Sequence, residues 1–366
     1  MHKIFLIDNS VITYKELISL VNGKINTEYL SEFELLLINK IKYLTGNNIL
    51  NFDDLIEKIK SSSNQITLET SGTTGLPKVI NHTIQSITKN IKISDDRCND
   101  IWGFTYNPNK MAGYQVLFQA ILNGNTIVNL FKYQFEEISN RIQKYNITHI
   151  SATPTFYKLL TSEAIDYLNV KHISLGGEGS DLETHRKIQK RFPNAKIKNI
   201  YASTEVSSLL ASEGEYFKIS EYNKEFIKVS DGKLKVHRNL VGNSNDITFD
   251  GDWYDTGDLI EMIDSTKFKI VGREGNLINI GGYQVNPIYI ENKINEIEYV
   301  KLSNVYSKSN SILGNILVCD IVLFVSKSVA DIKTDIKRLL NEYEVPTKIN
   351  IVDEIKINEN GKISRK

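Results

Sequence analysis

Hydrophobic residues recur with two different periods along the first two hundred residues of the chain. Short apolar or alternating runs predict strands, and apolar residues spaced three and four apart predict helices. Strands are expected at 3–7, 64–69, 101–105, 126–131, 148–152, 171–175 and 197–201. Helices are expected at 28–44, 52–60, 82–93, 113–123, 134–145, 155–168 and 181–191, with a further one opening at Thr13. This alternation is typical of a layered α/β domain with a largely parallel sheet.

The pattern changes twice further along. From about 214 to 271 it indicates short strands, with a hairpin turn at Ser230-Asp231-Gly232-Lys233. Beyond residue 272, strands at 277–280, 300–306, 315–325 and 347–352 are mixed with two helices, the first starting at Asn286-Pro287. We therefore expect a large α/β N-terminal domain over 1–272, which includes a small β-rich subdomain, and a small α+β C-terminal domain over 273–366.

Balanced charge limits the classes of partner. Lys+Arg and Asp+Glu both number 44, so no net field attracts nucleic acid or an anionic membrane. Cys98 and Cys319 fit neither a metal-binding spacing nor a disulfide framework, which favours a reducing cytoplasm. The apolar run at the N-terminus is too short for a signal peptide, and the run 316–325 has only strand length. We expect a cytoplasmic protein that binds neither nucleic acid nor membrane.

One loop has the composition of a phosphate-binding site. It follows the strand predicted at 64–69 and contains Thr70, Ser71, Gly72, Thr73, Thr74, Gly75 and Lys78. Glycines let the backbone approach an anion, and the hydroxyls and the lysine supply further donors. The spacing is not that of a Walker P-loop, because Pro77 stands where the second glycine would fall and Val79 replaces the Mg²⁺-binding hydroxyl. An ordinary Gly/Ser/Thr turn is the alternative from composition alone.

The order of residues in this loop, TSGTTGLPK, resembles the phosphate loop of the adenylate-forming superfamily. That superfamily includes acyl- and aryl-CoA synthetases, adenylation domains of peptide synthetases, and luciferases. The segment 199–205, Asn-Ile-Tyr-Ala-Ser-Thr-Glu, is similar to a second motif of the family, with Ala202 in place of the usual glycine. The resemblance implies that Tyr201 stacks on adenine, Thr204 contacts the α-phosphate and Glu205 helps to hold Mg²⁺. Asn199 belongs to the same motif.

Further motifs follow the family's order. Gly176, Gly177, Glu178 and Gly179 are similar to a glycine-rich turn whose backbone lines the adenine and acyl sites. Trp253-Tyr254-Asp255-Thr256-Gly257-Asp258, followed by Gly272-Arg273, resembles the ribose motif, which implies that Asp258 and Arg273 hold the ribose. The resemblance assigns Gly281 and Gly282 to a loop that meets the thiol substrate's arm. It assigns Lys362, in Asn-Gly-Lys-Ile-Ser-Arg, to the position of the catalytic lysine.

The chain departs from the family pattern in three places. The region before the phosphate loop is shorter than usual, so the family pattern does not predict how the acyl pocket or the surface of any homodimer is built. Gly275 stands at the hinge position, where Asp or Lys is common, and so bears on domain rotation. The segment Asn109-Lys110-Met111-Ala112-Gly113 has Lys110 where His is common. Lys110, Met111 and Gly113 are therefore candidate substrate residues.

The resemblance implies an acid–thiol ligase that uses ATP and Mg²⁺. A carboxylate would displace pyrophosphate to give an acyl-adenylate, the C-terminal domain would rotate about Gly275, and the thiol of CoA or of a carrier protein's phosphopantetheine would take the acyl group. The family's amino-acid-activating domains place an Asp in the segment that matches 106–113, to hold an α-ammonium group. This chain has none there, so the resemblance disfavours an α-amino acid and implies an aromatic or short to medium acyl carboxylate. Two alternatives stay open: a non-catalytic nucleotide-binding relative, and an adenylating enzyme with a non-thiol acceptor.

Overall fold

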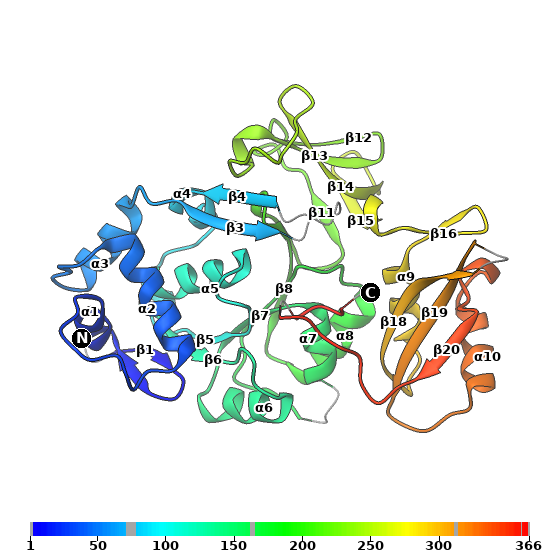
Figure 1. The fold of residues 1–366 in the computed structure, drawn as a ribbon, viewed down its shortest axis with the longest axis horizontal. Helices are drawn as coiled ribbons and strands as arrows, with labels where there is room; N and C mark the ends of the chain where they lie inside the picture. The colour runs from blue at the N-terminus through cyan, green and yellow to red at the C-terminus, as the bar shows by residue number, and fades with distance from the viewer. Residues whose placement is uncertain (1–2, 71–77, 162–164, 311–313, 360, 365–366) are drawn as a thin grey trace.

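An eight-stranded sheet forms the middle of the molecule (Figure 1). The computed structural model describes residues 3–70, 78–161, 165–310, 314–359 and 361–364 of the 366. The strand order is β10-β9-β8-β7-β5-β6-β1-β2, and all neighbours are parallel except at the two edges. The strands are β1 (Ile4–Ile7), β2 (Val11–Thr13), β5 (Ile101–Phe104), β6 (Thr126–Asn129), β7 (His149–Ala152), β8 (His172–Gly176), β9 (Lys196–Ser203) and β10 (Ser207–Ser212). The predicted α/β class with a largely parallel sheet is confirmed.

Helices cover both faces of this sheet, because neighbouring residues on each strand point to opposite sides. Leu6 and Ile127 pack with one set of helices, whereas the next residues, Ile7 and Val128, pack with the other. The first set is α1 (Tyr14–Val21), α2 (Glu32–Thr45), α3 (Phe52–Ser61), α4 (Ile84–Thr88) and α5 (Met111–Leu122). The second set is α6 (Phe135–Lys144), α7 (Pro154–Leu160) and α8 (Leu182–Arg191).

The segment after the phosphate loop differs from its prediction. Helix 82–93 was expected there, but residues 78–82 form strand β4 (Lys78–His82), which pairs with β3 (Ile66–Thr70) in an antiparallel hairpin. The helix is confined to 84–88. Ile80 and His82 are buried on one face of β4, an alternation typical of a strand, whereas the helical spacing of the isoleucines holds only for Ile84 and Ile87 within α4. The phosphate loop therefore connects two strands.

The β-rich segment forms a second sheet of five strands, in the order β11-β15-β14-β13-β12. These are β11 (Tyr216–Lys218), β12 (Ile227–Ser230), β13 (Lys233–His237), β14 (Trp253–Met262) and β15 (Lys267–Arg273). Ser230 pairs with Lys233, which confirms the predicted hairpin turn. Phe217, Leu234, Val236 and Phe268 form its core, together with Ile80 from β4 and Val206 beside β10. The second sheet thus packs on the edge of the first.

The last part of the chain has its own hydrophobic core. It contains the hairpin β16 (Ile278–Ile280)–β17 (Tyr283–Val285), helices α9 (Pro287–Ile294) and α10 (Val329–Leu339), and strands β18 (Val300–Asn310), β19 (Gly314–Leu323) and β20 (Lys348–Ile351). Helix α9 begins as predicted, with the Asn286 side chain accepting from the Ile288 amide at 3.0 Å. The buried members of this core all lie between 285 and 349. A boundary near 273 agrees with this separation but stays a prediction.

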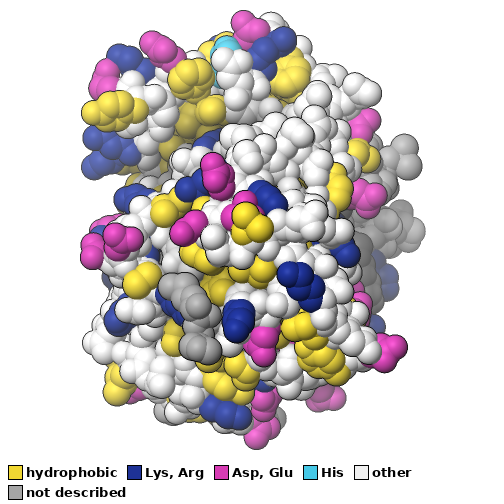
Figure 2. All heavy atoms as spheres, turned by 90° about the vertical axis from the view of Figure 1, so that its left-hand side faces the viewer, with side chains coloured by type: hydrophobic (Ala, Val, Ile, Leu, Met, Phe, Trp, Pro, Cys, Tyr) yellow, Lys and Arg dark blue, Asp and Glu magenta, His cyan; other side chains and the backbone are white. Residues whose placement is uncertain are grey.

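The chain then returns from β20 to the centre of the molecule (Figure 1). This return brings the C-terminal tail to the carboxyl ends of β7 and β8, where it contacts Thr153 and Gly177. On the face shown in Figure 2, Lys and Arg side chains are interspersed with Asp and Glu. Across the residues that the structure describes, no helix combines the length and the apolar character needed to cross a lipid bilayer.

Candidate active site

A cavity of about 890 Å³ lies at the C-terminal edge of the parallel strands. Tyr106 follows β5, Thr153 follows β7, Gly177 follows β8 and Thr204 follows β9, and all four line the cavity. The carboxyl ends of parallel strands are the usual place for ligands in such sheets, because the chain there turns into loops. Segments from the phosphate hairpin, the five-stranded sheet and the C-terminal tail complete the walls. The volume is large enough for a nucleotide together with a small acid.

Many of the predicted site residues meet in this cavity. The lining includes Thr70, Lys78, Lys110, Met111, Gly177, Thr204, Glu205, Arg273 and Lys362, although these residues span almost three hundred positions of the sequence. Ser71, Gly72, Thr73, Thr74 and Gly75 lie outside the described residues. Gly113, Glu178, Gly179, Asn199, Tyr201, Asp258, Gly281 and Gly282 are not among the lining residues.

The end of β9 is held by a histidine that the sequence did not single out. His82 Nε2 lies 2.6 Å from the Thr204 carbonyl oxygen, and burial lowers the pKa of this histidine, which favours a neutral ring. A carbonyl can only accept, so Nε2 carries the hydrogen. Gly242 donates its amide to the Glu205 carbonyl at 2.7 Å, and a Cβ there would lie 2.6 Å from the His82 ring. The backbone of Thr204 and Glu205 is therefore held in place by hydrogen bonds from His82 and Gly242.

Asp258 and Arg273 face each other across two paired strands. They are register partners on β14 and β15, with Arg273 Nε 3.9 Å from Asp258 Oδ1. Tyr201 donates its hydroxyl to Asp258 Oδ2 at 2.6 Å. Burial raises the pKa of the Asp258 carboxyl, against the opposing effects of Tyr201 and Arg273. Asp258 is thus a largely buried acceptor with a fixed direction, and Arg273 reaches from it to the cavity wall.

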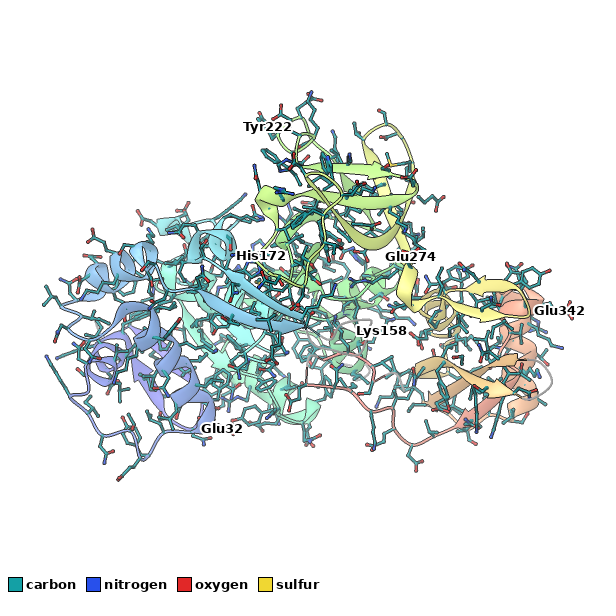
Figure 3. The ribbon with its side chains drawn as sticks, turned by 45° about the horizontal axis from the view of Figure 1, so that its top comes forward. Glu32, Lys158, His172, Tyr222, Glu274 and Glu342 are labelled. Atoms are coloured by element: carbon teal, nitrogen blue, oxygen red, sulfur yellow. The ribbon has the colours of Figure 1, made fainter. Side chains whose placement is uncertain are left out.

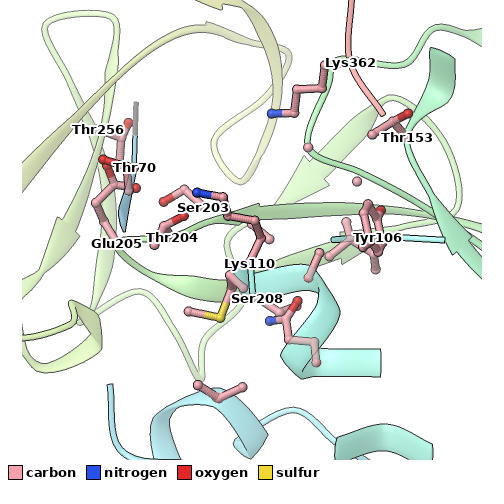
Figure 4. A pocket seen from close by; sticks show the side chains of 18 of the residues that line it. Thr70, Tyr106, Lys110, Thr153, Ser203, Thr204, Glu205, Ser208, Thr256 and Lys362 are labelled. Carbon is pink, nitrogen blue, oxygen red and sulfur yellow. The ribbon is translucent and has the colours of Figure 1, made fainter. Parts of the chain in front are cut away.

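The C-terminal tail places a lysine in the cavity. The tail forms a tight hairpin: Asn358 donates its amide to the Lys362 carbonyl at 2.8 Å, and Ile357 bridges Ile363. A Cβ built on Gly177 would lie 3.2 Å from Lys362 Cε and 3.5 Å from Nζ. In Figure 4, Lys362 and Thr153 lie on one side of the cavity and Thr204 and Glu205 on the other. The lysine therefore approaches the glycine turn and faces the end of β9.

The entrance of α5 shows why two of the candidate substrate residues occupy their positions. A Cβ on Gly113 would lie 2.4 Å from the Asn107 carbonyl oxygen, so only glycine lets the first turn of α5 approach that segment. Lys110 donates from Nζ to the Glu69 carbonyl at 3.1 Å. This cation therefore sits on the cavity wall beside the start of the phosphate loop.

Four other predicted residues make contacts outside the lining. Glu178 Oε2 accepts from the Thr155 amide at 3.1 Å, so its carboxylate serves the start of α7. Asn199 directs its amide to the Gly214 carbonyl at 3.4 Å. Gly281 and Gly282, both with positive φ, form the two-residue turn of the β16–β17 hairpin. Their predicted roles toward nucleotide and thiol stay predictions.

The cavity continues along α5, where sequence reasoning found nothing. Gln115 and Gln119 line it one and two turns beyond Met111, which corresponds to about 6 Å and 12 Å along the helix axis. Ile87, Asn90, Ile91, Trp102, Val116 and Ser208 complete this end. Gln115 Nε2 donates to Ser207 Oγ at 3.1 Å, whereas Gln119 Nε2 is buried without a hydrogen-bond partner among the described residues. The one-turn spacing of two glutamines in an otherwise apolar helix is the signal that could have identified it.

Comparisons with known proteins agree with this arrangement. The AMP-binding enzyme family matches residues 54–228. The human mitochondrial acyl-coenzyme A synthetase ACSM5 is 24% identical over 86% of this chain, which spans 64% of that protein's length. The 2-succinylbenzoate–CoA ligase of Oceanobacillus iheyensis is 25% identical over 81% of this chain and 67% of its own length.

The fold also matches solved structures. One is the o-succinylbenzoate CoA synthetase MenE of Bacillus subtilis, in complex with an acyl-adenylate intermediate. It superposes with a TM-score of 0.70 over 99% of this chain and 94% of its own, at 18% identity. At that identity the likeness shows a shared fold. The family match over residues 54–228, the relatives and the shared fold lead to one conclusion: this chain contains an AMP-binding enzyme segment and is similar over most of its length to adenylate-forming enzymes.

Proposed function

We propose that the protein is an acid–thiol ligase, which activates a carboxylic acid with ATP and then transfers the acyl group to a thiol. The observation that carries the proposal is the meeting of Lys78, Glu205 and Lys362 in one cavity, although they lie far apart in sequence. In the first step a carboxylate oxygen bonds to the α-phosphorus and the bond to pyrophosphate breaks. In the second the thiolate sulfur bonds to the acyl carbon and AMP leaves.

The residues in the cavity have charges that suit the first step. Lys362 would offset the negative charge of the incoming carboxylate and the charge that develops at the α-phosphorus. Lys78, with the loop before it, would hold the outgoing phosphates. Thr204 would donate to the α-phosphate, and the buried position of its carbonyl against His82 keeps the residue in place. Asp258 and Arg273 would hold the ribose, Tyr201 the adenine.

Glu205 suits a magnesium ion. Mg²⁺ commonly binds through one or two carboxylates together with substrate phosphates and waters. Glu205 is a buried carboxylate on the cavity wall, and the described residues contain no group of three or more acids, histidines or cysteines that would form an all-protein cage. When bound there, Mg²⁺ would neutralise phosphate charge during the transfer.

The far end of the cavity favours an acid that carries a neutral polar group. Its side walls are apolar, but the carboxamides of Asn90, Gln115 and Gln119 also line it. Asn90 donates to the Ser208 carbonyl and Gln115 to Ser207 Oγ, so a plain hydrocarbon tail would leave the buried Gln119 Nε2 without a partner, at a cost of about 1–3 kcal/mol. A hydroxyl or carbonyl oxygen on the tail would offer Gln119 an acceptor. Within the aromatic or short to medium acids expected, we therefore favour those with such an oxygen.

CoA is the acceptor that the names of the two relatives favour, and a carrier protein's phosphopantetheine is the alternative. Pyrophosphate release should be measured with MgATP and pairs of acids of equal length, with and without the distal oxygen. Each acid should then be tested with CoA and with carrier proteins for thioester formation. We expect a preference of about tenfold or more for the oxygenated acid, because a buried donor left unpaired costs more than one net hydrogen bond.

Gln119→Leu should remove the preference for the oxygenated acid. Pyrophosphate release with the acid that lacks the distal oxygen should still occur, because Lys362 is unchanged. Ser309→Ala, on the exposed end of β18, serves as a control and should behave as wild type. Equal rates for both acids of each pair would contradict the assignment of the acid. Tight ATP binding without pyrophosphate release from any acid would instead favour a non-catalytic nucleotide-binding protein.

A further inference from the structure

The tail that carries Lys362 docks on two side chains of the large α/β part. Thr153 Oγ1 donates to the Gly361 carbonyl at 2.5 Å, immediately before the lysine. Asn107 Nδ2 donates to Glu359 Oε2 at 3.1 Å. Both contacts join residues more than two hundred positions apart. We propose that Thr153 and Asn107 are positioning residues, which hold the tail hairpin so that Lys362 reaches the α-phosphate; this rests on the proposed adenylating function.

Thr153 is built into the structure rigidly enough to serve this purpose. It is buried, and its Oγ1 also accepts from the Phe156 amide at 3.1 Å as the N-cap of α7. One hydroxyl thus uses its acceptor side to start a helix and its hydrogen to hold the tail. A capping hydroxyl has a fixed rotamer, because its lone pair is already engaged. The position of its oxygen is therefore set before the tail arrives, and its hydrogen can turn toward the tail carbonyl.

The tail is shaped to fit this hydroxyl. Gly361 has φ +71°, and a Cβ on it would lie 3.3 Å from Thr153 Oγ1. Glycine thus allows both the turn and the close approach. The Asn358 side chain accepts from the Lys362 amide at 3.1 Å, so the lysine's backbone is tied to the same hairpin. Thr153 therefore fixes the position of Gly361, and the hydrogen bonds within the hairpin fix the Lys362 backbone relative to Gly361.

Asn107 connects the dock to the substrate side of the cavity. Its Oδ1 accepts from the Asn109 amide at 2.9 Å, next to Lys110. Its carbonyl is the group that excludes a Cβ at Gly113. The segment that receives Glu359 is therefore the same one that forms the entrance to α5. The Asn107 side-chain amide can donate to the Glu359 carboxylate, whereas an aspartate at position 107 would repel it.

The test uses hydrogen exchange and half-reaction kinetics on the full chain. In Thr153→Val, amide exchange of the peptide spanning 354–364 should accelerate roughly fivefold, the factor of one net hydrogen bond. Adenylation kcat should fall by about tenfold or more with the KM for ATP unchanged, because small misplacements of a reacting group are costly. Acyl transfer from preformed adenylate should keep its rate. Thr153→Ser, which keeps the hydroxyl, should restore both readouts.

Two further variants separate docking from helix capping. Thr13→Val removes the N-cap of α1, which accepts from the Glu16 amide at 3.2 Å, far from the tail, and should leave tail exchange unchanged. Asn107→Asp keeps the acceptor for the Asn109 amide but faces Glu359 with a second carboxylate, so it should release the tail. Adding Glu359→Gln should restore docking, because the new amide can donate to the carboxylate introduced at position 107.

Unchanged tail exchange in both Thr153→Val and Asn107→Asp would overturn the proposal. So would faster exchange with normal adenylation, since Lys362 would then not depend on the dock. Failure of the wild-type chain to form any acyl-adenylate would refute the proposed function, and it would be recognised separately, because the exchange experiment needs no substrate.

Discussion

The Lys362 side chain lies against Gly177, where a Cβ would come within 3.2 Å of Lys362 Cε. Gly177 also has φ +81°, a conformation that side chains rarely adopt. The contact joins the turn after β8 to the last residues of the chain. It exists only while the tail is folded back on the large sheet, as Figure 1 shows. This arrangement matches what the first half-reaction requires of a lysine.

Gly177→Ala should displace Lys362 and slow adenylation by roughly tenfold or more, because the added methyl occupies the lysine's approach. The positive φ should also lower stability by about 1–2 kcal/mol. Gly251→Ala is the matched control: Gly251 also has a positive φ, +59°, but its Cβ would meet nothing within 4 Å, so it should lower stability similarly and adenylate at the wild-type rate. Pyrophosphate exchange and thermal unfolding check both effects. Equal adenylation rates of the two variants would show that Gly177 does not shape the lysine's path.

Asp258→Ala should raise the KM for ATP by about tenfold with a smaller effect on kcat. Ribose contacts bind the ground state and the transition state alike, so their loss appears mainly in KM. The variant also leaves the Tyr201 hydroxyl without its acceptor. An unchanged KM for ATP, measured by initial rates of pyrophosphate release, would show that Asp258 does not hold the ribose.

As the pH falls, ATP binding should begin to weaken at a higher pH than it would if Asp258 had the pKa of an ordinary aspartate. Burial raises the pKa of Asp258, and only its ionised form accepts two ribose hydroxyls. The ratio of ATP affinities of wild type and Asp258→Asn cancels the titration of the nucleotide's phosphates. This ratio should fall as the pH drops through the raised pKa. The raised pKa also means that the folded state binds the Asp258 proton more tightly than the unfolded state does. The stability that this proton contributes is present below the unfolded-state pKa and is lost as the pH rises through the folded-state pKa. A ratio that does not change with pH would contradict the prediction.

Large parts of the fold could be predicted from sequence because its signals are local. The α/β alternation, the hairpin at Ser230–Lys233 and the start of α9 each depend on a few neighbouring residues. Strand β4 was missed because its partner is the other arm of a hairpin, and pairing rather than propensity decides it. Thr153 could not be identified, because its acceptor lies 208 residues away. Gln119 belongs to no motif; its one-turn spacing from Gln115 could have singled it out, but its place in the cavity wall depends on how α5 packs.

Gly275→Pro should separate the two half-reactions. Gly275 lies in the short 3₁₀ turn Glu274–Asn276, which joins β15 to the C-terminal unit and lines the cavity. Figure 3 shows Glu274 at this junction and Lys158 below it, where Lys158 Nζ donates to Asn292 Oδ1 at 3.1 Å across to α9. Rotation about the turn must break that contact and the tail dock. Proline fixes φ near −65° and removes an N–H, so it should restrict rotation.

We expect acyl-adenylate to form and accumulate in Gly275→Pro while thioester output falls. Lys158→Met provides a comparison, because it removes the Asn292 contact and should favour rotation. Loss of adenylation with transfer preserved would reverse which state is trapped but keep the hinge. Wild-type rates in both half-reactions, in a folded variant, would show that no rotation at this residue is needed.

The two half-reactions of Lys362→Ala, measured separately, test the account most directly. Lys362 reaches the cavity only with the tail docked, so its charge should matter for acyl-adenylate formation alone. Pyrophosphate release should fall by roughly 10²–10³-fold, the scale for one preorganised group that stabilises a transition state. Transfer from preformed acyl-adenylate to the thiol should stay within about twofold of wild type, a change smaller than the loss of one net hydrogen bond. Equal losses in both half-reactions, or a normal rate of pyrophosphate release, would contradict the assignment of Lys362 to the adenylating step.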